Sequence, residues 1–200
     1  HLGMSGKFLI IRKKDKRIFK TSFYYNLNIL KKHNHVHFIL NNGLILIYND
    51  VRRFGFFKIY NTTNINEIRF LKKLGPEPLG QKFNTSYFFK FIKNKKKNIK
   101  NLLMDQSFVS GLGNIYVSES LFHAGISPKR KARNVKGIRA VKLKIAIQKV
   151  LKNAIDAGGS TLRNHRQANG ELGYFQNQFS VYNQNGKPCP GCICSVKDTG

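Results

Sequence analysis

Two glycines one residue apart, Gly111 and Gly113, place the strongest constraint on how the centre of this chain folds. Asn114 follows them, and an apolar pattern at helical spacing continues through Ile115 and Leu121. Helix breakers, a capping-type residue and a periodic run together predict a turn that leads into the start of a helix. The first amides of a helix have no partner within it, so this turn is a candidate phosphate site.

The Gly-x-Gly spacing is not specific by itself. A third glycine is missing and no predicted strand precedes the pair, which excludes the dinucleotide-binding fingerprint. An ordinary turn between two helices is the simpler interpretation of this stretch taken alone. The choice depends on the rest of the chain.

The charge of the chain points to a polyanionic partner. Its 200 residues include 36 Lys and Arg against 9 Asp and Glu, a formal charge of +27. Such an excess favours nucleic acid first and an anionic membrane surface second. No apolar run has the length of a membrane span, and we expect no membrane partner. Three clustered cysteines and no secretory signal lead us to expect a cytoplasmic protein.

The first third of the chain predicts strands and the remainder mainly helices. Short β-type runs, with an Asn-Asn-Gly hairpin signal between the last two, are Lys7–Ile11, Val36–Leu40 and Leu44–Tyr48. Gly75 to Pro78 interrupts the pattern and predicts a link between domains. Helices are expected over 83–92, 99–104, from about 114, and over 135–157. A short β run is expected at Phe179–Tyr182.

The longest predicted helix shows an apolar stripe with lysines on its other face. The stripe that we expect to face the core consists of Ile138, Val141, Ile145, Leu151 and Ile155. Gly158 and Gly159 are expected to end this helix.

Four stretches carry candidate binding chemistry. A lysine run, Lys93 to Lys100, is either a solvated surface or a phosphate contact. Asp50 to Gly55 places two arginines beside Phe54, which taken alone is typical of a core aromatic. Three alternating histidines, from His33 to His37, have no acidic or cysteine partner nearby, so metal binding is the weaker interpretation there. Cys189 and Cys192 form a Cys-x-x-Cys, half of a tetrahedral zinc site.

Five ordered stretches together closely resemble the formamidopyrimidine-DNA glycosylase family. They are HLGMSG from His1, DVRRFG from Asp50, LGPEPL from Leu74, the 104–128 region around Gly111-Leu112-Gly113-Asn114, and GGSTLR from Gly158 with Gly173-Tyr174-Phe175. The resemblance implies an α+β fold in three parts. These are the end of a β-sandwich domain (1–74), a helix–two-turn–helix domain (75–172) with a lesion-capping loop (158–175), and a truncated zinc-finger β-hairpin (173–200).

By resemblance, particular residues acquire roles on DNA. Phosphate or DNA contacts are implied for His33, Arg52, Lys95, Lys100 and Asn114. The residues that fill the gap left by an extruded base are implied to be Met4, Arg52 and Phe54. Val51 stands where the family usually has a proline, so we expect a less rigid loop. The implied cofactor is one Zn²⁺, with Cys189 and Cys192 as two of its ligands.

The resemblance also implies a reaction. An N-terminal proline amine attacks the sugar, assisted by a glutamate and a lysine, and these three are expected upstream of His1, so this chain carries no catalytic residue. The implied function is removal of oxidised purines and cleavage at abasic sites in double-stranded damaged DNA, by a monomer. The alternative is a non-catalytic relative that only binds damaged DNA. A ribosome-type RNA binder would fit the charge but not the five ordered motifs.

Overall fold

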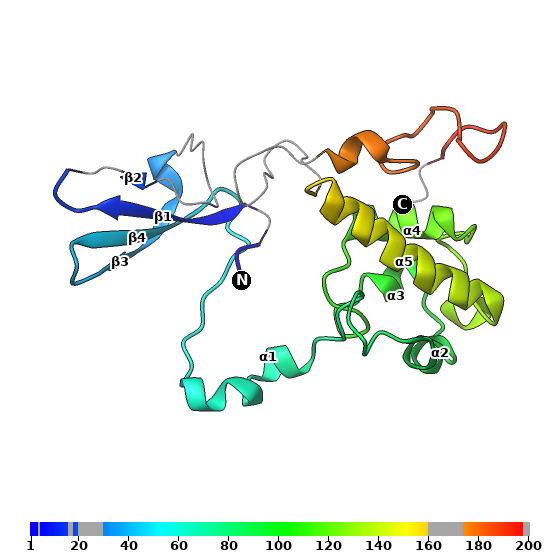
Figure 1. Cartoon of the computed structure of the whole chain (residues 1–200), viewed down its shortest axis with the longest axis horizontal. Coiled ribbons are helices and arrows are strands. Elements are labelled where there is room, and N and C mark those ends of the chain that lie inside the picture. The colour runs from blue at the N-terminus through cyan, green and yellow to red at the C-terminus, as the bar shows by residue number, and fades with distance from the viewer. Residues whose placement is uncertain (4, 16–17, 20–29, 160–173, 198–200) are drawn as a thin grey trace. The chain divides into compact units, whose positions relative to one another are not determined.

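The structure is a computed structural model that describes residues 1–3, 5–15, 18–19, 30–159 and 174–197. The chain divides into two compact units, which are described separately (Figure 1). The first unit contains residues 1–59 and 157–176, and the second contains residues 60–156 and 177–200.

The first unit is built on an antiparallel sheet with the strand order β2-β1-β4-β3 (Figure 1). Gly43, with a φ of +78°, turns the chain between the last two strands, where a residue without a Cβ is favoured. The predicted strands and the hairpin are therefore confirmed. The strands are β1 (Gly6–Arg12), β2 (Ile18–Phe19), β3 (Asn34–Ile39) and β4 (Leu44–Asp50), and the short 3₁₀ helix η1 (Lys31–His33) precedes β3.

The second unit is helical. Asparagine side chains start two of its helices, since Asn84 accepts from the amide of Tyr87 and Asn98 accepts from the amide of Asn101. The predicted helices over 83–92, 99–104 and from 114 are confirmed, with small shifts at the ends. The elements are η2 (Thr62–Glu67), α1 (Arg69–Lys72), α2 (Thr85–Ile92), α3 (Ile99–Leu103), α4 (Asn114–His123), η3 (Ala132–Asn134) and α5 (Ile138–Asp156).

The core of this unit is one cluster of buried apolar side chains from α2, α3, α4, α5 and the turns between them. Phe108 is fully buried in the turn between α3 and α4, and its ring contacts those of Phe83, Phe88 and Phe91. Burial of aromatic side chains of this size anchors the turn to α2 and the residues just before it. The glycine turn therefore rests on a rigid base.

The predicted core stripe of the longest helix was wrong for three of its five residues, whereas Leu151 packs against the core and Val141 is half-buried. Ile138, Ile145 and Ile155 are 67%, 55% and 63% exposed. The buried face of α5 instead consists of Ala140, Leu143, Ala146, Ile147, Val150 and Ala154. Both stripes follow helical spacing, and the packing of α5 against α4 and α2 selects the second one.

The short β run predicted at Phe179–Tyr182 was also wrong. These residues follow the 3₁₀ helix η4 (Phe175–Gln178) as bends and a turn. Further on, an isolated antiparallel bridge joins Pro188 to Ser195 and closes a short hairpin. Among the described helices, none has both the length and the apolar character needed to cross a membrane.

Candidate nucleic-acid interface

The N-terminus of α4 lies directly after the glycine turn. Gly111 has a φ of +81°, and Gly113 is the N-cap, with no side-chain hydrogen bond to the first turn. Asn114 is the first helical residue and not the cap that the sequence suggested. The first-turn amides of α4 thus face outward without a capping side chain, as an anion-binding helix terminus requires.

Gln106 holds the glycine turn in shape. Its side-chain oxygen accepts from the amide of Gly111 at 2.8 Å, and its side-chain nitrogen donates to the carbonyl of Leu112 at 3.1 Å. The backbone of Gly75 donates to the carbonyl of Gln106 at 2.8 Å. These contacts fix the direction in which the amides of α4 point.

Two predicted phosphate-binding residues come together at this terminus. Lys100, half-buried on α3, and Asn114, exposed on α4, line one groove of about 1010 Å³. The far wall of this groove is formed by residues of the 181–197 segment, which include Asn183 and Lys197. The groove therefore combines cationic, amide and helix-terminal donors, all suited to phosphate oxygens.

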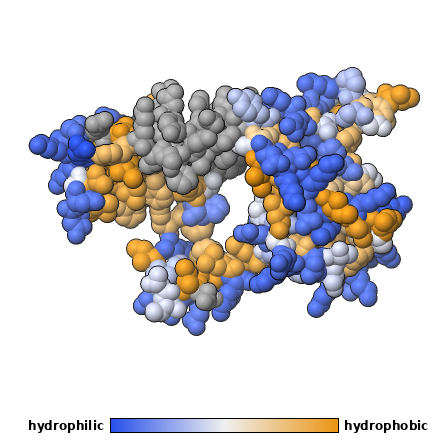
Figure 2. Space-filling model, viewed as in Figure 1, coloured by the Kyte–Doolittle hydropathy of each residue, from blue (hydrophilic) through white to orange (hydrophobic). Residues whose placement is uncertain are grey.

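Lys95 lies on the exposed loop between α2 and α3. Its Nζ is 4.8 Å from the centre of the Phe91 ring, and its carbonyl accepts from the amide of Arg133. This pairing brings the cationic segments 93–97 and 130–133 side by side. Figure 2 shows hydrophilic side chains over much of the visible face of the helical unit. The lysine run is thus part of a two-segment basic surface.

The predicted probe residues of the first unit follow β4. Arg52 and Phe54 are both exposed, and the Arg52 guanidinium lies 4.7 Å from the centre of the Phe54 ring. Phe54 is 59% exposed, so the interpretation of it as a core residue was wrong. Met4 lies outside the described residues. His33, half-buried, ends η1 in this unit.

A buried carboxylate organises the start of this loop. Asp50 is fully buried, and its two oxygens accept from the Ser5 and Tyr48 hydroxyls and from the amides of Arg52 and Gly55. Burial alone would raise the pKa of Asp50, but these four hydrogen bonds outweigh it and hold the pKa well below its usual range. Asp50 is therefore a buried anion at neutral pH.

A second buried carboxylate connects α4 to the C-terminal segment. Glu119, 1% exposed, accepts from the amides of Ser180, Val181 and Tyr182 at 2.8, 3.0 and 2.8 Å. The sequence reasoning did not single out Glu119, or Asp50 for this role. The sequence does contain a signal for Glu119. The chain has few acidic residues, and an acidic residue among apolar ones on a helix predicts a hydrogen-bonding partner elsewhere in the fold.

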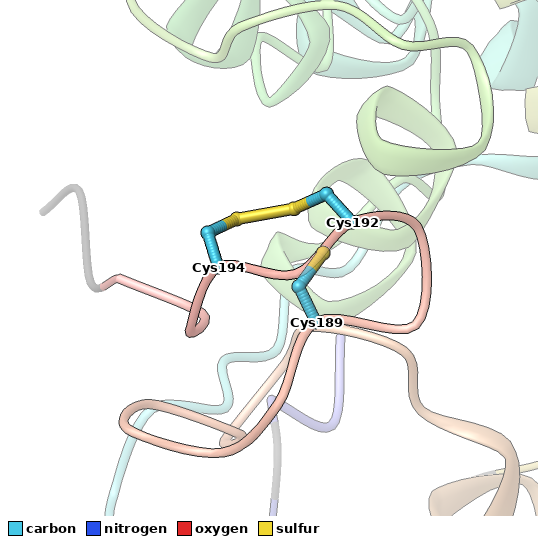
Figure 3. A group of neighbouring side chains, drawn as sticks. All are labelled: Cys189, Cys192 and Cys194. Atoms are coloured by element: carbon cyan, nitrogen blue, oxygen red, sulfur yellow. A yellow bond between two sulfur atoms is a disulfide. The ribbon is translucent and has the colours of Figure 1, made fainter.

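The three cysteines gather in the C-terminal hairpin (Figure 3). Their sulfurs lie within 4.8 Å of one another, and Cys192 and Cys194 are joined in a disulfide, with Cys189 free beside it. Tetrahedral zinc–thiolate sites have Zn–S distances of about 2.3 Å, so thiols this close fit one ion once the disulfide is reduced. The described residues supply three thiols for a site that needs four ligands.

Comparison with known protein families gives two matches. The formamidopyrimidine-DNA glycosylase N-terminal domain matches residues 1–57, and the H2TH domain of formamidopyrimidine-DNA glycosylase matches residues 74–166. Both described units thus contain a region that matches a part of the same family.

Individual proteins show the same likeness. The chain is 48% identical over 203 residues to a formamidopyrimidine-DNA glycosylase of Rhodopseudomonas palustris (strain TIE-1), covering 98% of this chain and 69% of that protein. The corresponding protein of Ruegeria pomeroyi is 43% identical over 199 residues, with the same coverage.

Solved structures agree. One is Lactococcus lactis Fpg in complex with DNA that contains an abasic site, with a TM-score of 0.79 and 32% identity. Another is MutM in complex with DNA that contains carbocyclic 8-oxo-G, also with a TM-score of 0.79 and 32% identity. Each comparison covers 98% of this chain and 67% of the solved chain.

Proposed function

The chain belongs to the formamidopyrimidine-DNA glycosylase family, and from this premise we propose its function. It is a base-excision-repair DNA glycosylase and abasic-site lyase that removes oxidised purines from damaged DNA by base flipping. Relatives above 40% identity over 98% of the chain are named formamidopyrimidine-DNA glycosylases, which supports this proposal. The chain spans about 69% of the length of those relatives.

The proposed binding mode assigns the helical unit to the phosphate backbone. Lys100, Asn114 and the first-turn amides of α4 hold one phosphate, and Lys95 neutralises another from the adjacent basic surface. Such contacts fix the protein on the duplex without reading its sequence. His33 contributes a further DNA contact from the sheet unit.

The proposed probe is formed by Met4, Arg52 and Phe54. An enzyme that acts on a base must take it out of the stack and fill the gap behind it. The exposed Arg52–Phe54 pair offers a cationic plane stacked on an apolar ring, which suits insertion between base pairs. The loop 158–175, of which residues 160–173 lie outside the described residues, is proposed to cap the extruded purine.

The proposed cofactor is one Zn²⁺ held in part by Cys189 and Cys192. A structural zinc would supply no reaction step; it would fix the hairpin that closes the phosphate groove. The proposal also includes a monomer in the cytoplasm. Its domain boundaries are residues 1–74, 75–172 and 173–200.

Borohydride trapping tests the enzymatic part of the proposal. The intact protein is mixed with an 8-oxoguanine duplex and reduced, with an undamaged duplex of the same sequence as control. An amine nucleophile that expels the base leaves an imine, and reduction converts it into a stable protein–DNA adduct. An adduct with the damaged duplex alone is the expected result. Damage-selective binding without an adduct would instead support the non-catalytic alternative.

A further inference from the structure

Two segments of the first unit lie against each other where β1 begins and β4 ends. Gly6 pairs with Asp50 in the sheet, and the amide of Phe56 donates to the carbonyl of His1 at 3.0 Å. A Cβ on Gly3 would stand 3.0 Å from the carbonyl carbon of Phe54. Residues 1–3 and 5–6 thus pack tightly against residues 51–56, which contain Arg52 and Phe54.

The Asp50 carboxylate joins these segments. One oxygen accepts from the Ser5 hydroxyl at 2.5 Å and the Arg52 amide at 3.2 Å. The other oxygen accepts from the Tyr48 hydroxyl and the Gly55 amide, both at 2.9 Å. Ser5 belongs to the first segment and Arg52 and Gly55 to the second, so one side chain fixes both.

We infer that Asp50 is the positioning residue of the lesion probe. It holds Ser5, next to the start of β1, and the Arg52–Phe54 loop in a fixed relation, so that the loop enters the duplex in one conformation. The inference rests on the proposed function, because it presupposes that Arg52 and Phe54 insert into DNA. It adds a residue that touches neither DNA nor the reacting atoms.

The buried charge of Asp50 is better explained by a positioning role than by a contribution to stability alone. A buried carboxylate loses its hydration, and the donors to it are two hydroxyls and two amides rather than a cationic side chain. An apolar side chain at this position would avoid that desolvation cost. It would also leave the amide of Gly55 without its acceptor and the amide of Arg52 with the Ser5 hydroxyl alone, so the loop would lose its anchor.

Asp50→Asn separates the two effects. An amide side chain has one accepting oxygen, so its NH₂ must face either the Ser5–Arg52 pair or the Tyr48–Gly55 pair. A hydroxyl can rotate to accept from that NH₂, but a backbone amide cannot. The substitution therefore takes the Asp50 acceptor away from the amide of Gly55, or from that of Arg52, which keeps the Ser5 hydroxyl at 3.1 Å. Side-chain volume is almost preserved.

The test measures affinity for a duplex with an abasic-site analogue and for an undamaged duplex, using the intact protein. For D50N we expect affinity for the abasic-site duplex to fall about tenfold, which corresponds to the loss of one charge-assisted hydrogen bond. Affinity for the undamaged duplex should change less than about twofold. D15N is the matched control, because Asp15 is exposed in the same unit and its substitution also removes one negative charge. D15N should alter both affinities alike.

A double variant tests whether Asp50 acts through Arg52. D50N should weaken binding to the abasic analogue by a smaller factor in the R52A background than in the unmodified protein, since R52A has already removed one of the contacts that Asp50 positions. Losses that multiply, or a D50N loss that is equal on both duplexes, would overturn the inference and leave the proposed function standing.

Amide hydrogen exchange of the DNA-free protein distinguishes failure of this inference from failure of the proposed function. D50N should speed exchange at Gly55 at least about tenfold, or at Arg52 by a smaller factor because Ser5 still accepts from that amide, with the amide of Ile47 in β4 unchanged. If the unmodified protein shows no preference for the abasic analogue, the proposed function fails. Unchanged exchange at both amides would overturn the inference whatever the DNA measurements give.

Discussion

Glu119→Ala should detach the C-terminal segment from α4. The carboxylate is 1% exposed and accepts three amide hydrogen bonds from residues 180–182, which lie 61 to 63 positions further along the chain. A hydrogen bond to a charged group contributes about 1.5–3 kcal/mol when its partners are fully desolvated. The three donor residues are only half-buried, so water recovers part of each bond.

The expected loss is therefore about 3 kcal/mol of unfolding free energy, at about 1 kcal/mol for each bond. That is a large share of the 5–15 kcal/mol typical of a folded domain. Glu119→Gln should cost roughly half as much. Its oxygen can keep the two bonds now made by Oε1, to Val181 and Tyr182, and it loses the bond to Ser180.

Urea denaturation and amide hydrogen exchange measure this prediction together. We expect the exchange of the three amides to rise in E119A, with the amides of α5 protected as before. Glu67→Ala is the matched control, because Glu67 is exposed in the same unit and its change removes the same charge. If E119A and E67A have equal unfolding free energies and the 180–182 amides exchange as in the unmodified protein, the reasoning is refuted.

Three further predictions concern other parts of the molecule. Lys95→Ala should lower the slope of log affinity against log salt by about 0.9 and equally for damaged and undamaged duplexes; an unchanged slope would remove Lys95 from the phosphate contacts. Burial and the hydrogen bond to Asp50 raise the pKa of Tyr48 to about 12, so its stabilisation is complete below about pH 10 and is lost as the pH rises to about 12. Tyr48→Phe should abolish this loss of about 2–3 kcal/mol of unfolding free energy between pH 10 and 12. The denaturation midpoint of the variant should therefore depend less on pH in that range. Cys189→Ser should reduce the zinc content of the reduced intact protein, measured by atomic absorption, and equal zinc in both proteins would exclude Cys189 as a ligand.

The places where sequence prediction succeeded share one property. The strands around Gly43, the helices after Asn84 and Asn98 and the turn at Gly111 are all set by contacts within a few residues. Capping side chains and left-handed glycines act locally, so their pattern is legible in the sequence. The ordered motifs added the family and the function.

The failures occurred where a distant segment made the choice. Helix α5 carries two apolar stripes, and only packing against α4 and α2 buries Leu143 and Ile147 and exposes Ile145. Val181 and Tyr182 have strand-forming side chains, but their amides donate to Glu119 and so do not enter a sheet ladder.

The same reason explains the two buried acids. The sequence alone determined that the chain is cationic, that a glycine turn leads into α4, and that Arg52 and Phe54 stand together after a strand. Only the tertiary structure decided that the side chains of Asp50 and Glu119 are buried and accept several hydrogen bonds. One of the four donors to Asp50, Ser5, lies 45 residues before it, and all three donors to Glu119 lie more than 60 residues after it. A carboxylate is stable inside a protein only where such donors converge, and convergence is a property of the fold.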